Sequence, residues 1–535
     1  MSASARHRVE TRAPRGEVRP DLVDVRDETR HRFLEDAAHY PGGEVRGVAF
    51  PQTEAEVAAL CTLGVPLLPI GAQSSLTGGA TPRGEIVVCT SHLVDIALLD
   101  NGLVRAGAGV TLDRLQDALS GRGLWYPPVP TYTSCTCGGV VATNAAGPAT
   151  FKYGTTRAWV AGLTTILPDG RVLDLVRDQA VAHPDGYFEI VSGDRAIRVP
   201  VPRVARPSVP KCSAGYFGAA GMDLVDLFIG AEGTLGITTA VAFRTAPTPA
   251  ATLAAMVTAP SAESALTLVT RLRDASEATR RTRDPFGIDA VAIEMIDARS
   301  IALLREDAAD TRLGVSLAPA ARIVLFVELE SNSPLSDEDA WRQAEGALTG
   351  GDADGPVARL CRLLADADLL DATELALPGQ VARRERFRQL REAVPDAVNR
   401  RVALAKVTDD RISKTAADIV VPFARFAELM TACDHAFVSR GLDYAVWGHV
   451  SDGNVHPNAI PRSFDDVARG REAVMAIGEA AIALGGAPLA EHGVGRNAIK
   501  KALLRQLHGD AGIASMQAVK RALDPNGLLA PGVLL

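Results

Sequence analysis

The strongest constraint on the fold is a series of short β-branched segments, separated by glycine and proline, over residues 45–245. Runs such as VPLLPI, EIVVCT and LVRAG have the length and residue types of strands. Helical periodicity appears between some of them, and Thr53 and Glu56 have the spacing of a capping box. We therefore predict an α+β or α/β domain that ends at the proline-rich segment around Pro247 and Pro249.

The pattern changes to longer elements after this segment. Residues 261–276 and 337–348 have helical periodicity, and VAIEMID and RIVLFVELES have the composition of strands. This alternation predicts an antiparallel sheet covered by helices on one face. We thus expect an extension over residues 1–39, a first domain over residues 40–247, and a second domain over residues 248–535 whose last segment returns to the first domain.

Composition and charge limit the class of protein. Hydrophobic residues make up 47% of the 535 residues, which is enough for large cores. The net charge of −8 provides no basic field for nucleic acid. The seven cysteines are scattered without a CxxC motif, so we expect reduced thiols and no iron-sulfur module within the chain. A charged N-terminal segment and the lack of a long apolar run predict a cytoplasmic protein, with peripheral attachment to a membrane left open.

Three segments rich in small residues are candidates for ligand binding. The first, PIGAQSSLTGG, can direct backbone N–H groups at a phosphate, although an ordinary glycine turn has the same composition. The second, SCTCGGVVATNAAGPATFKYGTTRAW, allows the backbone to approach a large flat ligand. The third, IGAEGTLGI, is by itself equally consistent with a hairpin. Neither a Walker A motif nor a complete GxGxxG is present, so a nicotinamide-binding motif is not indicated.

Taken in this order, the three segments resemble the FAD-binding domain of the vanillyl-alcohol oxidase superfamily, the PCMH-type fold, and its D-lactate, glycolate and D-2-hydroxyglutarate dehydrogenase branch. The resemblance implies a two-lobed α+β FAD-binding domain followed by an antiparallel-sheet substrate domain covered by helices. The sequence departs from the family pattern at Ile70, Gln73 and Ala530, where Arg, Gly and Asn are usual. The residues that the resemblance assigns to the cofactor are Ile70, Gly71, Ala72, Gln73, Ser74, Ser75, Gly78, Pro130, Thr131, Thr136, Gly138, Gly139, Thr143, Asn144, Gly154, Glu232, Gly236 and Ile237.

The FAD is expected to be bound non-covalently. The three segments contain no histidine at the places where this family attaches its flavin, and His92 lies in a strand-like run.

A fourth segment, AVWGHVSDGNVHPN, predicts a hairpin with two histidines on one face. If Val450 pairs with Val455, His449 lies directly opposite His456, and two such imidazoles can chelate one metal ion. The alternative is two unrelated surface histidines. Glu491 could supply a third ligand, although with His492 it is also consistent with a charged helix start.

The same dehydrogenase branch has H-x-x-D-G-N-x-H and E-H-G-x-G motifs. The resemblance thus implies a divalent metal, zinc or manganese, held by His449, His456 and Glu491. We expect His492 to be the catalytic base, with its side chain directed away from the metal so that its imidazole is free for proton transfer. By the same resemblance Arg391, Lys414 and Asn458 contact the substrate.

The resulting prediction is an FAD-dependent, metal-assisted oxidation of a small 2-hydroxy acid to the 2-oxo acid. Electrons would pass to an external acceptor, such as a quinone, an electron-transfer protein or a separate iron-sulfur subunit, and a homodimer is left open. Two alternatives remain at this point. One is a metal-dependent hydrolase that uses His449, His456 and Glu491, and the other is a flavoprotein that binds FAD without this activity.

Overall fold

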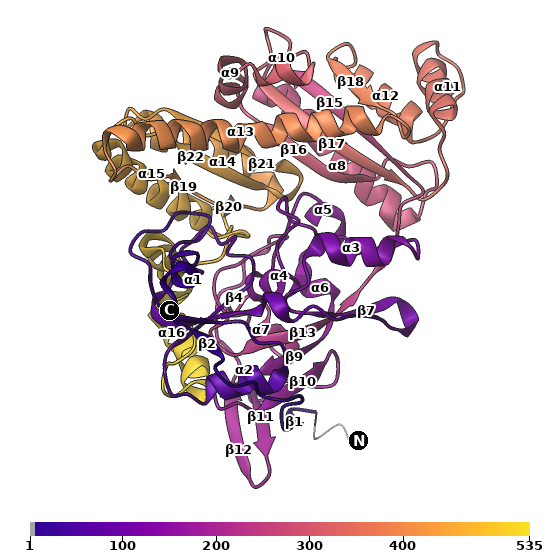
Figure 1. The fold of residues 1–535 in the computed structure, drawn as a ribbon. Helices are drawn as coiled ribbons and strands as arrows, with labels where there is room; N and C mark the ends of the chain where they lie inside the picture. Colours follow the sequence, from indigo (N-terminus) through magenta and orange to yellow (C-terminus); the bar gives the residue numbers. More distant parts are fainter. Residues whose placement is uncertain (1–5) are drawn as a thin grey trace. The chain divides into compact units, whose positions relative to one another are not determined.

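Two units make up the computed structural model, which describes residues 6–535 (Figure 1). Unit 1 comprises the described residues up to Gly147, then Gly154–Pro247 and Ala487–Leu535, and unit 2 comprises Pro148–Tyr153 and Thr248–Gly486. The first five residues of the expected N-terminal extension lie outside the described residues. Within the described part of the chain, none of the helices has the length and apolarity needed to cross a membrane.

Unit 1 contains a partly parallel sheet and an antiparallel sheet. The first has the order β2-β3-β5-β4, with β5 parallel to both β3 and β4, and the second has the order β10-β9-β13-β7-β6. The strands are β1 Arg8–Glu10, β2 Val23–Asp24, β3 Glu44–Ala49, β4 Leu67–Ile70, β5 Arg83–Cys89, β6 Ile96–Leu98, β7 Leu103–Gly107, β8 Leu124–Trp125, β9 Val160–Ile166, β10 Val172–Val176, β11 Tyr187–Ser192, β12 Arg195–Pro200, β13 Ile237–Arg244 and β14 Ala246–Pro247. The helices are α1 Asp27–His31, α2 Glu54–Cys61, α3 Leu112–Ser120, α4 Cys137–Thr143, α6 Thr156–Trp159, α7 Val225–Phe228 and α16 Ala498–Leu523.

The helix that the capping pattern predicts is present. The Thr53 side chain accepts a hydrogen bond from the Glu56 N–H at the start of α2. One local expectation is wrong, because His92 lies in the 3₁₀ turn η2 Thr90–His92 and not in a strand. The third small-residue segment follows the helix α7, so its alternative interpretation as a hairpin turn does not hold.

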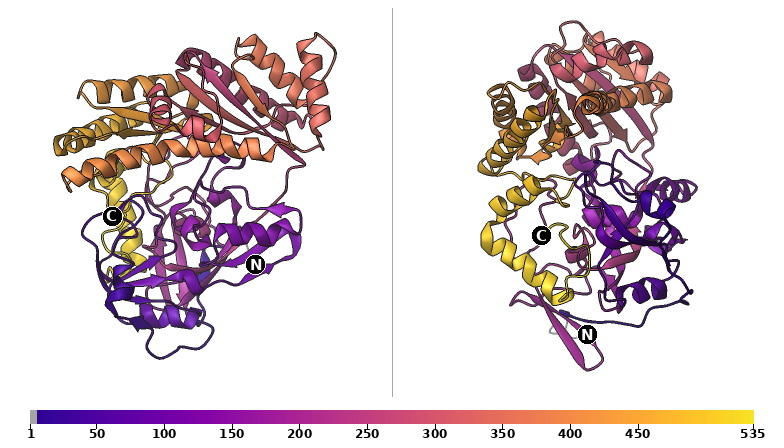
Figure 2. Two further views of the ribbon diagram at one scale, coloured as in Figure 1. Left: turned by 45° about the horizontal axis from the view of Figure 1, so that its top comes forward. Right: turned by 60° about the vertical axis from the view of Figure 1, so that its left-hand side comes forward.

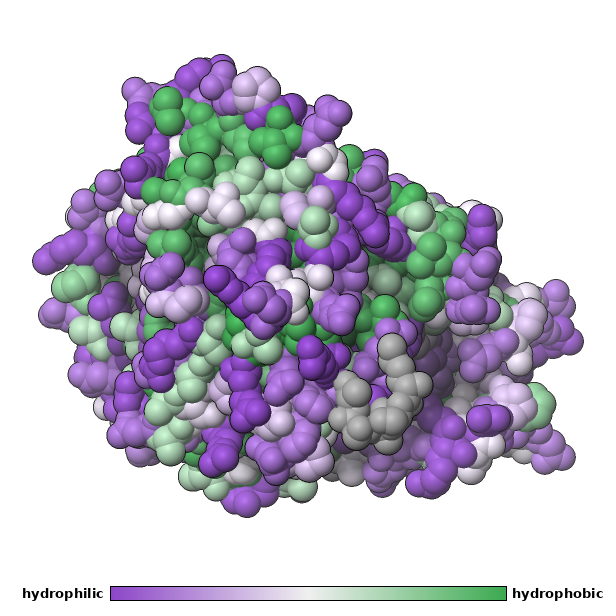
Figure 3. All heavy atoms as spheres, turned by 90° about the horizontal axis from the view of Figure 1, so that it is seen from below, coloured by the Kyte–Doolittle hydropathy of each residue, from purple (hydrophilic) through white to green (hydrophobic). Residues whose placement is uncertain are grey.

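The C-terminal segment is part of unit 1. The helix α16, yellow in Figures 1 and 2, packs against β12 and is interrupted at Gly509. Its Leu504, Met516 and Val519 belong to the same buried apolar cluster as Val48 of β3. The segment therefore supplies part of the core of unit 1. Figure 3 shows a face on which hydrophilic side chains surround smaller hydrophobic areas.

Unit 2 is built on an antiparallel sheet of order β18-β15-β17-β16-β21-β22-β19, with β20 also paired to β22. The strands are β15 Ala251–Ala259, β16 Ala290–Ile296, β17 Ile323–Ser331, β18 Thr373–Ala376, β19 Thr415–Ala416, β20 Ile419–Val420, β21 Tyr444–His449 and β22 Asn454–Ala459. The helices are α5 Thr150–Tyr153, α8 Ala262–Thr282, α9 Ala298–Glu306, α10 Ala309–Leu313, α11 Asp337–Leu348, α12 Pro356–Asp366, α13 Val381–Thr408, α14 Phe426–Val438 and α15 Phe464–Ala483, with the 3₁₀ turns η4 Phe423–Arg425 and η5 Val450–Asp452.

The antiparallel sheet that the sequence predicts is present, but the helices do not cover it in the predicted way. Every residue of β16 is buried. Because successive side chains of a strand point to opposite faces, both faces of the sheet are covered at this strand. The expectation of helices on a single face is therefore wrong, and β16 has the continuous apolar composition of a strand buried on both sides.

Candidate functional site

The three small-residue segments meet in unit 1. A Cβ on Gly71 would lie 2.2 Å from the Thr136 Oγ1, which places the first segment against the second. The Glu232 N–H donates to the Ala142 carbonyl at 2.8 Å, which places the third segment against the second. The fold therefore brings together three segments that are far apart in the sequence. Their backbone N–H groups are the kind of donors that a cofactor with a pyrophosphate would require.

The first segment turns sharply after β4. Gln73 has a φ of 56°, in the left-handed region where glycine is favoured, and its side-chain amide donates to the Glu35 carbonyl at 3.0 Å. The Ser75 hydroxyl accepts from the N–H groups of Thr77 and Gly79. Ile70 is buried at the end of β4. The other predicted residues of the first segment are Ala72, Ser74 and Gly78, and they belong to the same turn after β4.

The second segment forms the helices α4, α5 and α6, and α5 belongs to unit 2. Thr136 caps α4 by accepting from Gly139, and Thr143 donates to the Gly139 carbonyl at 3.1 Å. The Asn144 side chain accepts from the Arg157 N–H at 2.9 Å. Four further predicted residues complete the segment: Gly138 packs on Ala108, Pro130 on Gly147, Gly154 has a φ of 72°, and Thr131 is exposed.

The third segment joins the C-terminal part of unit 1. The partly buried Glu232 carboxylate accepts from the N–H groups of Val494 and Gly495, both at 2.8 Å, and desolvation by the surrounding protein raises its pKa. Gly236 has no room for a side chain beside Thr165, and Ile237 starts β13. Glu232 therefore ties the predicted cofactor segment to the E-H-G-x-G segment.

Unit 2 carries the two histidines on one face of β21 and β22, but in a register that differs from the prediction. His456 pairs with Trp447, and His449 is diagonal to it, with ring centroids 5.5 Å apart. Gly453, at a φ of 74°, closes a turn that already begins at Val450, so Val450 does not pair with Val455. Side chains alternate between the two faces of a strand, and the observed register differs from the predicted one by two residues. Both histidines therefore remain on the same face.

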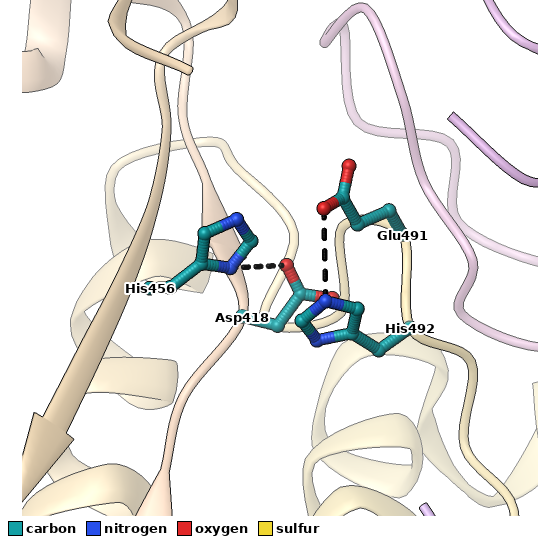
Figure 4. Close-up of side chains that lie close together, drawn as sticks. All are labelled: Asp418, His456, Glu491 and His492. Carbon is teal, nitrogen blue, oxygen red and sulfur yellow. Dashed lines mark ion pairs between the residues drawn. The ribbon is translucent and has the colours of Figure 1, made fainter. Parts of the chain in front are cut away.

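Each histidine has a carboxylate partner in unit 2. The Nδ1 of His456 lies 3.5 Å from Asp418, a pair drawn in Figure 4, and the Nδ1 of His449 contacts Glu294 of β16. On the same strand the Asn458 side chain is 1% exposed, and its Oδ1 has no hydrogen-bond partner among the described residues. Imidazole, carboxylate and an unpaired amide oxygen together fit a divalent cation or a polar ligand.

The two predicted cations also belong to unit 2. The buried Arg391 of α13 binds Glu294 through Nε at 2.8 Å and Nη2 at 2.7 Å. The Lys414 ammonium donates to Asn399 at 3.0 Å, and the protein around it desolvates it and lowers its pKa to about 8.

Glu491 and His492 belong to unit 1. The His492 Nε2 lies 3.6 Å from the Glu491 carboxylate, a pair drawn in Figure 4, so the imidazole lies beside the carboxylate of a proposed metal ligand. Both side chains offer a ligand atom to a metal. The Glu491 carboxylate also binds Lys211 at 2.9 Å, and the Lys211 side chain is only 1% exposed.

The sequence prediction missed Glu294, Asp418 and Lys211. A signal existed for Glu294, because a charged residue in the otherwise apolar run AVAIEMI must have a buried partner. No comparable signal marks Lys211, which lies in an irregular segment.

Comparison with known proteins decides the family. Residues 258–534 match the family model described as FAD linked oxidases, C-terminal domain, and residues 45–175 match an FAD binding domain. The chain belongs to the FAD-linked oxidases. It is thus an FAD-linked oxidoreductase, and the family match supports FAD as its cofactor and argues against the metal-dependent hydrolase.

Several named relatives of this FAD-linked oxidase align over most of its length. It is 27% identical to the glycolate oxidase subunit GlcD of Bacillus subtilis, over 91% of this chain and 88% of that one. It is 25% identical to a D-lactate dehydrogenase of Archaeoglobus fulgidus, over 91% and 90%, and 26% identical to the mitochondrial D-2-hydroxyglutarate dehydrogenase of Bos taurus, over 91% and 76%. A solved alkyldihydroxyacetonephosphate synthase shares the fold, with a TM-score of 0.59 at 14% identity, over 96% of this chain and 82% of that one.

Proposed function

We propose that this FAD-linked oxidase converts a small 2-hydroxy acid to the corresponding 2-oxo acid. The relatives named above support the substrate class. The observation that carries the proposal is in unit 2, where one face of β21 and β22 presents His449, His456 and Asn458, with Arg391 connected to His449 through Glu294. Imidazoles can bind a divalent metal ion, and a guanidinium can bind a carboxylate, so together these groups suit a hydroxy acid bound to a metal.

A divalent metal, zinc or manganese, is part of this proposal. His449, His456 and Glu491 are the proposed ligands, and Asp418 is a further carboxylate beside His456. When bound, the ion would lower the pKa of the substrate hydroxyl group. Asp418 extends the ligand set that the sequence motifs indicate.

The chain's own residues divide the remaining tasks. His492 accepts the hydroxyl proton at an imidazole nitrogen, because it lies beside Glu491 and a neutral imidazole is a base near neutral pH. Arg391 and Lys414 bind the substrate carboxylate, and Asn458 donates to or accepts from the substrate oxygens. FAD, when bound non-covalently in unit 1, supplies the acceptor for the hydride that leaves the substrate carbon. An external acceptor then reoxidises the protein.

The test is anaerobic bleaching of the protein's flavin by a panel of hydroxy acids. The panel contains glycolate and both enantiomers of lactate and of 2-hydroxyglutarate. We expect at least one member to reduce the flavin, and acid precipitation to release FAD into solution. Metal analysis of the same samples should show a divalent ion in the wild type and less of it in His456→Ala. If no hydroxy acid bleaches the flavin, the protein is instead a flavoprotein without this activity.

A further inference from the structure

Glu294 is a buried carboxylate whose two oxygens serve two different partners. It lies on β16 directly opposite His449 of the neighbouring strand β21. One oxygen, Oε1, contacts the His449 Nδ1, and the other, Oε2, accepts from the Nε and Nη2 of Arg391. The Glu294 side chain is 8% exposed and those of His449 and Arg391 are 3% and 11% exposed, so all three are largely withdrawn from water.

The surroundings of Glu294 require these partners. Its strand is otherwise apolar over Ala290–Ile296, and a buried carboxylate without compensation is strongly unfavourable. The guanidinium of Arg391 balances its charge, and the imidazole N–H of His449 satisfies the other oxygen. A hydrophobic residue would fill the same space without this cost, so packing alone does not account for a glutamate at this position.

We propose that Glu294 is a positioning residue that orients both His449 and Arg391. This inference rests on the proposed function, because it assigns the other ring nitrogen of His449 to the metal and the free end of Arg391 to the substrate carboxylate. A carboxylate only accepts hydrogen bonds, so the proton of His449 is on Nδ1 and the lone pair on Nε2 faces a metal. Glu294 engages the Nε and Nη2 of Arg391, which directs Nη1 to the substrate carboxylate.

The Glu294 carboxylate has two effects that can be measured separately. Loss of the bond to His449 weakens metal binding, since partners of a ligating imidazole typically contribute ~10–100-fold in affinity. Loss of the bond to Arg391 raises the KM for the hydroxy acid, because the guanidinium that binds the substrate carboxylate is no longer held in place. A residue with only a structural role would change neither quantity in a protein that remains folded.

The experiment compares Glu294→Gln, Glu294→Asp and the wild type as FAD-loaded proteins. Zinc affinity is measured by competition with a chelator, and cobalt absorption reports on imidazole ligation. We expect Glu294→Gln to bind zinc ~10–100-fold more weakly, to alter the cobalt spectrum and to raise the KM. Glu294→Asp should recover part of both losses, because it keeps the charge.

The matched control is Glu330→Gln. Glu330 is a buried glutamate of the neighbouring strand β17, and it binds Lys152 and Tyr153 of α5. We expect this variant to be less stable with unchanged zinc affinity. Wild-type zinc affinity and KM in a folded Glu294→Gln would overturn the inference, and so would a loss of zinc affinity in Glu330→Gln as large as in the Glu294 variants. Absence of bleaching in the wild type itself would instead overturn the proposed function.

Discussion

Departures from the family pattern coincide with unusual backbone conformations. Gln73 stands where the family has glycine and Ala530 where it has asparagine, and their φ angles are 56° and 43°. Glycine and asparagine are the residues that adopt left-handed φ most readily. This chain therefore adopts left-handed φ at two positions without glycine or asparagine, and at the first the Gln73 side chain donates to the Glu35 carbonyl.

His492 should be essential for flavin reduction but not for cofactor binding. General-base loss typically lowers rates by ~10²–10⁴-fold, so His492→Ala should bleach at least a hundredfold more slowly while it retains FAD and metal. Anaerobic stopped-flow absorbance measures the rate. His435→Ala, an exposed histidine of α14, is the control and should react as the wild type does. Loss of metal in His492→Ala would make His492 a ligand instead.

The charge of Lys414 should make substrate affinity depend on pH. Its pKa is lowered to about 8, so the ammonium is present below pH 8 and is lost as the pH rises through this value. Because the neutral amine binds a carboxylate weakly, the KM should rise between roughly pH 7 and pH 9.

A charge-assisted hydrogen bond contributes ~1.5–3 kcal/mol, so Lys414→Met should raise the KM at pH 7 by roughly tenfold or more and flatten this dependence. Lys406→Met, an exposed lysine of α13, should leave the KM profile unchanged. An unaltered profile in Lys414→Met would assign the dependence to another group.

At the scale of single elements, α13 carries both a proline and Arg391, the residue proposed to bind the substrate carboxylate. Pro395 lies inside the helix and has no N–H, so the carbonyl of Arg391, four residues earlier, receives no helical hydrogen bond. Pro395→Ala would supply this donor and stabilise an isolated helix by up to ~3 kcal/mol. We expect a higher melting temperature together with a higher KM, because the backbone at Arg391 shifts. A higher melting temperature with an unchanged KM would show that Pro395 does not set the position of Arg391.

The elements also show how far the sequence could be interpreted. Helices with strong caps, such as α2, and apolar strands such as β17 were predictable because local patterns determine them. The register of β21 and β22 was not, because it depends on where the turn begins, and Val450 is apolar yet belongs to the turn. The contacts of Glu294 with His449 and Arg391 could not be predicted from the sequence either, because they depend on which strands and helices become neighbours in the fold.

At the scale of the whole molecule, Arg496 connects distant parts of unit 1. Its guanidinium binds Glu85 at 2.7 Å, the Thr81 carbonyl at 2.9 Å and the Pro531 carbonyl at 2.6 Å. Breaking a buried ion pair typically costs ~3–5 kcal/mol. Arg496→Met should therefore lower the melting temperature and release FAD more readily, which flavin fluorescence during heating would measure.

The control for this prediction is Arg505→Met, because Arg505 forms an exposed ion pair with Asp510. It should change neither the melting temperature nor FAD release. Equal stability of the two variants would show that the C-terminal segment is not fixed to unit 1 through Arg496.

The position of Ala487–Leu535 in unit 1 has a consequence for biosynthesis. All of Thr248–Gly486 is translated before this segment leaves the ribosome, which takes tens of seconds at ~5–20 residues per second. At the end of that interval all of unit 2 has been synthesised, whereas the N-terminal part of unit 1 still lacks the apolar partners Leu504, Met516 and Val519. The order of folding should therefore be the reverse of the order of synthesis, and a nascent chain arrested before Ala487 should not retain flavin.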